Sequence, residues 1–173
     1  MKELILGGVR SGKSRLAEQR ARDSGRPVLY LATALAAGDA ELAQRIRKHR
    51  ERRPAEWLTV EEPLALGEAL RAHDAEDRII VVECLTLWLT NLLCMAPKRL
   101  ERERRSLCTA VAALAADLVM VSNETGFGVV PIGALSRRFV DASGELHQTL
   151  AALCERVTLT VAGLPLVLKH GEP

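Results

Sequence analysis

This sequence has few aromatic residues and little net charge, and both features argue against binding to nucleic acid. Phe, Trp and Tyr make up 3% of the 173 residues, so few side chains are available to stack on the bases of single-stranded nucleic acid. The formal net charge is only +2, so no overall field attracts the protein to a polyanion. We therefore expect no nucleic-acid partner.

Long apolar runs and paired cysteines are missing as well. No apolar run reaches the ~18 residues of a membrane-spanning helix, and the opening segment MKELILGG is too short for a signal peptide. Cys84, Cys94, Cys108 and Cys154 include no C-x-x-C pair, which argues against a zinc ribbon or a thioredoxin-type site. Each cysteine has apolar neighbours, so we expect buried, reduced thiols in a cytoplasmic protein without a membrane span.

Short apolar segments alternate with longer segments of helical pattern, which predicts an α/β fold. The apolar segments are nearly continuous, as is typical of parallel strands covered by helices on both faces. We expect a single domain over residues 1–173, with a mostly parallel sheet and its ligands at the carboxyl ends of the strands. The predicted strands cover residues 3–6, 28–32, 79–83, 118–122 and 157–163, with a last strand at 164–169 that pairs with its neighbour through a turn at Gly163; the predicted helices cover about 14–24, 39–53, 63–73, 85–95, 99–116 and 132–154.

The clearest motif is GGVRSGKS, from Gly7 to Ser14, which fits the phosphate-loop pattern G-x-x-x-x-G-K-[ST]. It lies between a predicted strand and a predicted helix, a context that a chance glycine-rich turn does not require. In such a loop the backbone N–H groups and the helix N-terminus surround phosphate oxygens. We expect Lys13 to reach the β- and γ-phosphates of a nucleoside triphosphate and the Ser14 hydroxyl to bind Mg²⁺.

A phosphate loop needs an acidic partner for Mg²⁺, normally at the end of another strand. Glu83 directly follows the apolar segment IIVV, so we expect it to emerge at the carboxyl end of its strand and to join the metal site. Asn123 and Glu124 follow another apolar strand, and for them a role in the site and a structural turn both stay open. The segment TGFG at 125–128 is a candidate lid.

The densest positive charge lies in QRIRKHRERRP, residues 44–54, which contains one of the four histidines. Leu42, Ile46 and His49 are spaced by four and three residues, so in a helix they lie on one face. We therefore expect His49 to continue the apolar face of this helix, away from its solvated side.

Two arginines, Arg45 and Arg53, lie one helical turn from His49 on either side. Nearby cations lower the pKa of an imidazole and keep one ring nitrogen unprotonated and nucleophilic. The same cations are suited to bind phosphate groups. A purely structural helix histidine is the alternative, but the phosphate loop elsewhere in the chain favours covalent nucleotidyl chemistry on His49.

Five segments together resemble the bifunctional adenosylcobinamide kinase / adenosylcobinamide-phosphate guanylyltransferase family. They are GGVRSGKS, RIRKHRERRPAEWLTVEEP, ECLTLWLTNLL, SNETGFGVVP and AGLPLVLK, and the match runs from Leu4 to Lys169. The phosphate loop alone is weak support for this family, whereas the order and spacing of all five segments are specific. The resemblance implies a P-loop NTPase fold of the recombinase-like type, a homotrimer, Mg²⁺, and GTP and ATP as substrates.

The resemblance implies two reactions in the assembly of the nucleotide loop of cobalamin. In the first, a nucleoside triphosphate phosphorylates adenosylcobinamide. In the second, GTP transfers GMP to adenosylcobinamide phosphate through a guanylyl-histidine, here His49, to give adenosylcobinamide-GDP and pyrophosphate. The resemblance places further nucleotide contacts at Gly7, Gly8, Val9, Arg10, Ser11, Gly12, Lys13, Ser14, Ala32, Thr33, Ala34, Arg50, Glu51, Arg52, Arg53, Glu61 and Glu83.

The sequence departs from the family pattern in SGELHQTLAALCERV. His147 stands where Asn is expected, and Cys154, Glu155 and Arg156 stand where Ala, Asp and Glu are usual. These positions lie away from His49 in the sequence, so we expect them to affect oligomer or corrinoid contacts more than the guanylyl step.

Two rival functions explain less of the sequence. A P-loop small-molecule kinase without a covalent intermediate accounts for the phosphate loop and Glu83, but it leaves His49 and its arginines without a role. A nucleic-acid-binding module would use the basic segment, but the small net charge and the scarce aromatics argue against it.

Overall fold

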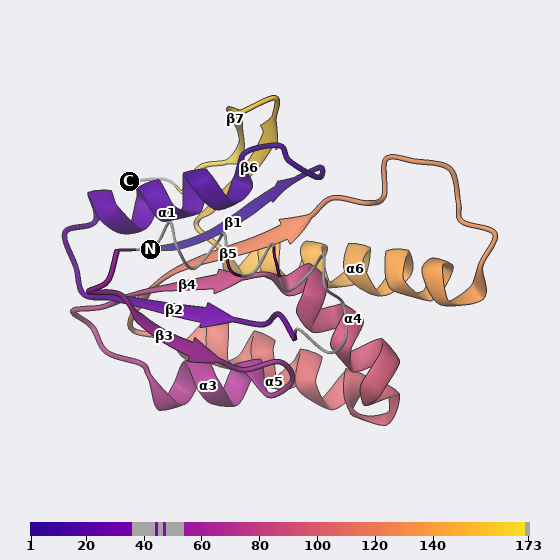
Figure 1. The fold of residues 1–173 in the computed structure, drawn as a ribbon, viewed down its shortest axis with the longest axis horizontal. Coiled ribbons are helices and arrows are strands. Elements are labelled where there is room, and N and C mark those ends of the chain that lie inside the picture. The colour runs from indigo at the N-terminus through magenta and orange to yellow at the C-terminus, as the bar shows by residue number, and fades with distance from the viewer. Residues whose placement is uncertain (36–43, 45–46, 48–53, 172–173) are drawn as a thin grey trace.

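The computed structural model describes residues 1–35, 44, 47 and 54–171, and a seven-stranded sheet forms their centre (Figure 1). The strand order is β3-β2-β4-β5-β1-β6-β7. All neighbouring strands are parallel except β6 and β7, which are antiparallel. The strands are β1 (Lys2–Gly7), β2 (Val28–Ala32), β3 (Leu58–Glu61), β4 (Ile79–Glu83), β5 (Asp117–Asn123), β6 (Arg156–Val161) and β7 (Leu164–Lys169).

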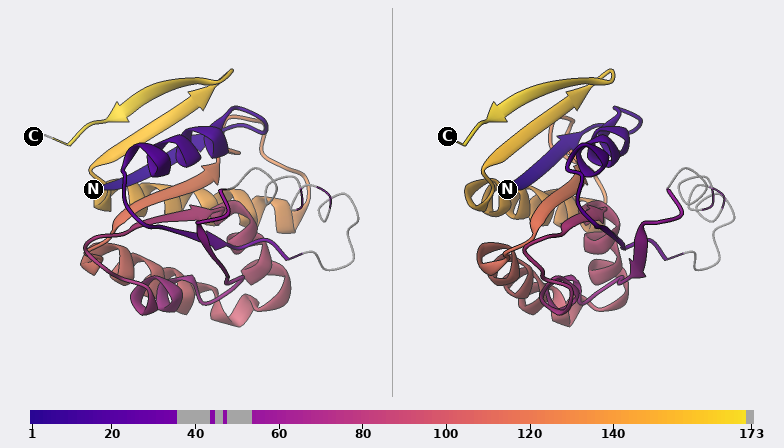
Figure 2. Two further views of the ribbon diagram at one scale, coloured as in Figure 1. Left: turned by 60° about the vertical axis from the view of Figure 1, so that its left-hand side comes forward. Right: turned by 90° about the vertical axis from the view of Figure 1, so that its left-hand side faces the viewer.

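Helices cover both faces of the sheet, as its apolar strands require (Figure 2). Helix α1 (Lys13–Asp23) lies on one face, and the other described helices lie on the opposite face. These are α3 (Leu66–Ala72), α4 (Leu85–Met95), α5 (Leu100–Ala113) and α6 (Ala134–Leu153), with a short 3₁₀ helix, η1 (Pro97–Arg99), between α4 and α5. None of the described helices is long and apolar enough to cross a membrane.

The alternation of side chains along each strand divides the core into two parts. In β1, Leu4 and Leu6 belong to the larger cluster under α3–α6, whereas Ile5 belongs to the smaller cluster under α1. Trp88 of α4 is fully buried in the larger cluster, and its Nε1–H donates to the Leu64 carbonyl oxygen at 2.8 Å. The sheet is therefore covered on both faces by apolar side chains of the helices.

Most of the predicted elements are confirmed, and the differences have physical reasons. The parallel edge strand β3 was not predicted, because only Val60 of its four residues is partly buried and it lacks an apolar run. The predicted last strand and its turn at Gly163 are confirmed by the antiparallel β6–β7 pair. The prediction that all four cysteines are buried is wrong for Cys94, which lies on the exposed side of α4.

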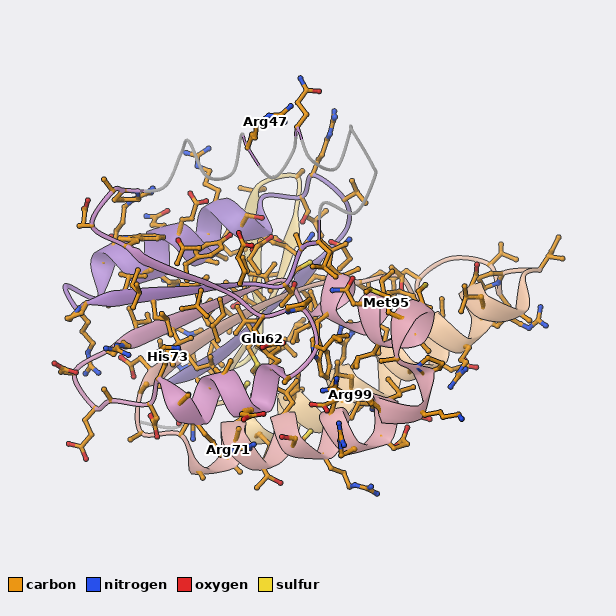
Figure 3. All side chains as sticks on the ribbon, turned by 60° about the horizontal axis from the view of Figure 1, so that its bottom comes forward. Arg47, Glu62, Arg71, His73, Met95 and Arg99 are labelled. Atoms are coloured by element: carbon orange, nitrogen blue, oxygen red, sulfur yellow. The ribbon has the colours of Figure 1, made fainter. Side chains whose placement is uncertain are left out.

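The predicted helix at 39–53 lies almost wholly outside the described residues. Of this segment the structure describes only Gln44 and Arg47, which are both helical and exposed. Figure 3 shows the Arg47 side chain pointing away from the body of the protein. Arg47 is thus solvated, while His49 is not among the described residues.

Candidate active site

Two glycines shape the loop that connects β1 to α1. Gly7 has φ 154°, and a Cβ there would lie 2.4 Å from the Thr160 carbonyl oxygen. Gly12 has φ 102° at the N-cap of α1, and a Cβ there would lie 3.1 Å from the Gly163 Cα. Both positions therefore need a residue without a side chain, as the phosphate-loop motif predicts.

The Lys13 side chain folds back across this loop. Its Nζ donates to the Gly8 carbonyl oxygen at 2.6 Å and lies 3.4 Å from Ser11 Oγ. Burial lowers the pKa of Lys13, while the Glu83 carboxylate and Cys84 act in the opposite direction. The ammonium group is thus held at the loop, where phosphate oxygens of a nucleotide would replace the carbonyl as its acceptors.

The exposed part of the loop carries the residues between its glycines. Gly8, Val9 and Arg10 are exposed, and Val9 has 71% of its surface accessible. Arg10 has φ 56°, a left-handed conformation that is unusual for a residue with a Cβ and that turns the loop sharply. The predicted nucleotide contacts of these three residues require such an open rim.

Ser14 and Glu83 meet at the base of the loop. The Ser14 hydroxyl donates to Glu83 Oε1 at 2.8 Å, although 69 positions separate the two residues in sequence. Glu83 is partly exposed after four buried residues of β4, which confirms its predicted emergence at the carboxyl end of the strand.

The Ser14 hydroxyl and the Glu83 carboxylate are ligands that suit Mg²⁺. They are too few for a metal ion that is bound by protein side chains alone. One hydroxyl and one carboxylate lie within a hydrogen bond of each other. Within the described ranges there is no group of three or more His, Cys, Asp or Glu side chains that could hold a metal ion. Mg²⁺ commonly takes one or two protein ligands and completes its shell with phosphates and water. Metal binding by Ser14 and Glu83 remains a prediction.

Three residues predicted to contact nucleotide lie in one row across the sheet. Ala32 of β2 is in register with Glu61 of β3 on one side and with Glu83 of β4 on the other. The row runs along the carboxyl ends of these parallel strands, where ligands of open α/β sheets bind. Glu61 is exposed there. The sheet thus brings together residues that are widely separated in the sequence.

Thr33, the residue after β2, holds the end of β4 in place. Its hydroxyl donates to the Cys84 carbonyl oxygen at 2.7 Å and accepts the Cys84 N–H at 2.8 Å. Its own N–H donates to the Glu83 carbonyl oxygen, and its carbonyl oxygen accepts Asn91 Nδ2–H at 2.8 Å. Thr33 is fully buried. Thr33 therefore positions Glu83, and Asn91 supports Thr33 through the hydrogen bond to its carbonyl oxygen. The sequence indicated neither role.

Burial and the nearby Glu83 carboxylate raise the pKa of Cys84 to about 11. This thiol therefore stays protonated at neutral pH, and protonated thiols are poor nucleophiles. Cys84 is accordingly a structural neighbour of Glu83 within the site.

The hairpin formed by β6 and β7 supports the phosphate loop from its other side. The Gly163 N–H, at the tip of the hairpin, donates to the Ser11 carbonyl oxygen at 2.9 Å. The Thr160 hydroxyl donates to the Leu6 carbonyl oxygen at 2.9 Å and lies 3.2 Å from Ser11 Oγ. The sequence offered no signal for this contact, because the residues involved are about 150 positions apart.

Asn123 and Glu124 lie beside the loop, at the end of β5. The Glu124 N–H donates to the Gly7 carbonyl oxygen at 2.9 Å, and the Asn123 N–H donates to Thr86 Oγ1 at 2.7 Å. Both residues are partly buried. They therefore adjoin the start of the phosphate loop, at the edge of the candidate site.

Of the remaining predicted residues, Ala34 follows Thr33 just after β2 and is half-buried, and its predicted nucleotide contact stays a prediction. His49 and the segment Arg50, Glu51, Arg52 and Arg53 lie outside the described residues. Their predicted roles as nucleotide carrier and nucleotide contacts stay predictions.

Comparisons with known proteins identify relatives along the whole chain. Residues 3–168 match the model of a family described as cobinamide kinase / cobinamide phosphate guanyltransferase. The chain is 59% identical to the bifunctional adenosylcobalamin biosynthesis protein CobP of Pseudomonas aeruginosa over 174 residues, which cover 100% of this chain and 99% of that protein. It is 38% identical to the bifunctional adenosylcobalamin biosynthesis protein CobU of Escherichia coli K12 over 180 residues, which cover 96% of this chain and 98% of that protein.

A solved structure supports the fold. The crystal structure of the RadB recombinase superposes with a TM-score of 0.50 at 17% sequence identity, covering 91% of this chain and 73% of that one. Identity this low shows the fold alone. The predicted recombinase-like P-loop fold is confirmed.

Proposed function

Because this chain belongs to the cobinamide kinase / cobinamide phosphate guanyltransferase family, we propose that one nucleotide site in it carries out both reactions of that family. The first phosphorylates the aminopropanol hydroxyl of adenosylcobinamide with a nucleoside triphosphate. The second transfers GMP from GTP to adenosylcobinamide phosphate and yields adenosylcobinamide-GDP and pyrophosphate. The observation that carries the proposal is the complete phosphate loop joined to the end of β4 by the Ser14–Glu83 hydrogen bond.

The phosphate loop serves both reactions because each begins with a bound triphosphate. Backbone N–H groups of residues 7–14 surround the phosphates, and the Lys13 ammonium group replaces its contact with the Gly8 carbonyl by contacts with phosphate oxygens. Ser14 and Glu83 would hold Mg²⁺, which neutralises charge on the β- and γ-phosphates when it is bound. We also expect nucleotide contacts at Ala32, Ala34 and Glu61, at the carboxyl edge of β2 and β3.

We propose that His49 carries the GMP group in the second reaction. Its unprotonated ring nitrogen attacks the α-phosphorus, a P–N bond forms, and the bond to the α,β-bridging oxygen breaks as pyrophosphate leaves. An oxygen of adenosylcobinamide phosphate then attacks the same phosphorus and releases the imidazole. The support is the resemblance of the segment around His49 and the match of the whole chain to the family.

Labelled GTP tests the covalent step directly. Incubation with Mg²⁺ and GTP labelled at the α-phosphate is expected to leave label on the denatured chain, and γ-labelled GTP is expected to leave none. The linkage should be labile in acid and stable in base, as a phosphoramidate is. His49→Asn is expected to remove the label.

The outcomes separate the bifunctional enzyme from a kinase without a covalent intermediate. Undiminished α-label on His49→Asn would refute His49 as the carrier and direct attention to Lys48 or His147. A wild-type chain that phosphorylates adenosylcobinamide but takes up no α-label would leave only the kinase function.

We further propose that the protein works as a homotrimer in the cytoplasm. The support for a trimer is the family resemblance together with exposed apolar side chains between β5 and α6, which include Val129 and Ile132. The support for a reducing compartment is that all four cysteines are unpaired.

A further inference from the structure

Glu124 lies where the sheet meets the phosphate loop. Strand β5 pairs with β1 on one side and with β4 on the other, so the residue after β5 lies between the start of the phosphate loop and the end of β4 (Figure 1). The hydrogen bond from the Glu124 N–H to the Gly7 carbonyl oxygen fixes its backbone to the loop. Its side chain is 16% exposed. A partly buried acidic residue is therefore held against the start of the phosphate loop.

A buried histidine faces this carboxylate from α6. His147 Nδ1 lies 3.6 Å from Glu124 Oε2, and His147 Nε2 lies 2.7 Å from Ser122 Oγ and 3.4 Å from Ser143 Oγ. Ser122 Oγ is in turn 3.4 Å from Thr86 Oγ1 of α4. When the Ser122 hydroxyl donates to Nε2, the ring proton is on Nδ1 and points to Glu124. The polar side chains thus form one continuous chain that ends at the carboxylate.

The contacts of Glu124 with His147 and its serine partners are not needed to form the turn after β5. The turn after β5 uses only Glu124 Oε1, which accepts the Gly126 N–H at 2.6 Å. Burial lowers the pKa of His147, and the Glu124 carboxylate opposes that effect. A neutral imidazole at this position orients the second carboxylate oxygen through its Nδ1–H and leaves the carboxylate able to accept a proton.

We propose that Glu124 is the general base of the kinase reaction and that His147 is a positioning residue that orients it. This inference rests on the proposed function, since it requires an alcohol as phosphate acceptor. The acceptor oxygen attacks the γ-phosphorus, the bond between that phosphorus and the β,γ-bridging oxygen breaks, and the hydroxyl proton passes to Glu124 and then to water. The guanylyl reaction has an anionic phosphate oxygen as acceptor, so it needs no such base.

The two half-reactions provide an internal comparison for Glu124. Glu124→Gln keeps the backbone contact with Gly7 and an acceptor for the Gly126 N–H, but it cannot take up the proton. We expect the kcat of the kinase reaction to fall about 10²- to 10⁴-fold, and the kcat of guanylyl transfer to adenosylcobinamide phosphate to fall far less. Glu145→Gln is the matched control, because Glu145 is an exposed carboxylate on α6 that pairs with Arg104 at 2.9 Å.

The kinase and guanylyl activities of Glu124→Gln and of the wild type distinguish failure of this inference from failure of the proposed function. A kinase kcat of Glu124→Gln equal to that of the wild type would overturn the inference alone. Equal losses in both half-reactions would also overturn it, because they would indicate damage to the shared phosphate loop. A wild-type protein without kinase activity would overturn the proposed function and this inference with it.

A pair of variants tests the positioning role of His147. His147→Leu removes both ring nitrogens, and we expect the kinase kcat to fall about ten- to a hundredfold while the KM for adenosylcobinamide changes little. His147→Asn retains an N–H donor, and we expect it to recover most of that loss. Equal kcat values for the Leu and Asn variants, both shown to be folded by thermal melting, would refute the positioning role.

Discussion

Among single residues, Lys13 has the most direct influence on the proposed chemistry, because its ammonium group already lies inside the phosphate loop, 2.6 Å from the Gly8 carbonyl oxygen. Lys13→Ala leaves the loop backbone in place and removes the side-chain cation that we expect to reach the β- and γ-phosphates. We predict that both activities fall roughly a hundredfold or more, measured as kcat/KM in separate assays of the two half-reactions. Lys98→Ala, at an exposed lysine of η1, is the control. Normal activity of Lys13→Ala in one half-reaction would show that this half-reaction uses another nucleotide site.

A second prediction at this scale concerns Glu83. Glu83→Gln can still accept the Ser14 hydroxyl, whose oxygen lies 2.8 Å from Oε1, but it loses the negative charge that Mg²⁺ prefers in a ligand. We expect the Mg²⁺ concentration needed for half-maximal turnover to rise at least about tenfold, with little change in the thermal midpoint. A Mg²⁺ titration of each half-reaction measures this. A titration curve that coincides with that of the wild type would remove Glu83 from the metal site.

Local patterns were sufficient to predict much of the site at the scale of residues. The motif at Gly7–Ser14 is contiguous, and Glu83 follows a run of apolar residues, so both were visible in the sequence. Thr33 was expected to contact nucleotide, which stays a prediction, whereas the two hydrogen bonds between its hydroxyl and the backbone of Cys84, 51 positions away, were not foreseen. Contacts of that kind depend on strand order, which periodicity does not encode.

Among the elements, the hairpin of β6 and β7 provides a test of stability. Its two-residue turn consists of Ala162 with φ 52° and Gly163 with φ 82°. Turns of this kind strongly prefer Asn-Gly, because Asn tolerates positive φ much better than Ala. Ala162→Asn is therefore expected to stabilise the protein by about 0.5–1 kcal/mol, which corresponds to an increase in Tm of about 1–4 °C. Thermal melting followed by circular dichroism measures the shift, and an unchanged or lower Tm would contradict the prediction.

Strands and helices with many buried residues were predicted with accurate bounds, and those with few were not. The apolar segments 28–32 and 79–83 and the helix 85–95 have the predicted bounds, because each has enough buried residues to leave a clear pattern. The strand β3 has almost none, and it was missed. It is recognisable only through its pairing with β2, since its register brings Glu61 beside Ala32.

At the scale of the whole molecule, the connection between β5 and α6 extends away from the sheet (Figure 1). It carries Phe127, Val129, Val130 and Ile132, which have 82%, 94%, 74% and 96% of their surfaces exposed. A concentration of exposed apolar side chains is typical of a protein–protein interface. We therefore expect this connection to contribute to the proposed homotrimer.

A charge placed in this connection tests the expectation. Ile132→Glu should shift the protein from trimer to monomer in sedimentation equilibrium, because an ionised carboxylate is costly to bury in an apolar interface. Met95→Glu, a similar change at an exposed residue near the end of α4, is the control for a general effect of charge. A wild-type protein that sediments as a monomer would refute the trimer, and a trimeric Ile132→Glu protein would place the interface elsewhere.

The position of β1 in the sheet has a consequence for biosynthesis. Strand β1 precedes the other six described strands in the sequence, but it pairs with β5 and β6, and the loop that follows it is held by the hairpin tip at Gly163. During synthesis the phosphate-binding motif is therefore made before the strands that hold it, and the hairpin is the last of these partners. We therefore expect the phosphate loop to take its final shape only after the hairpin of β6 and β7 has been synthesised.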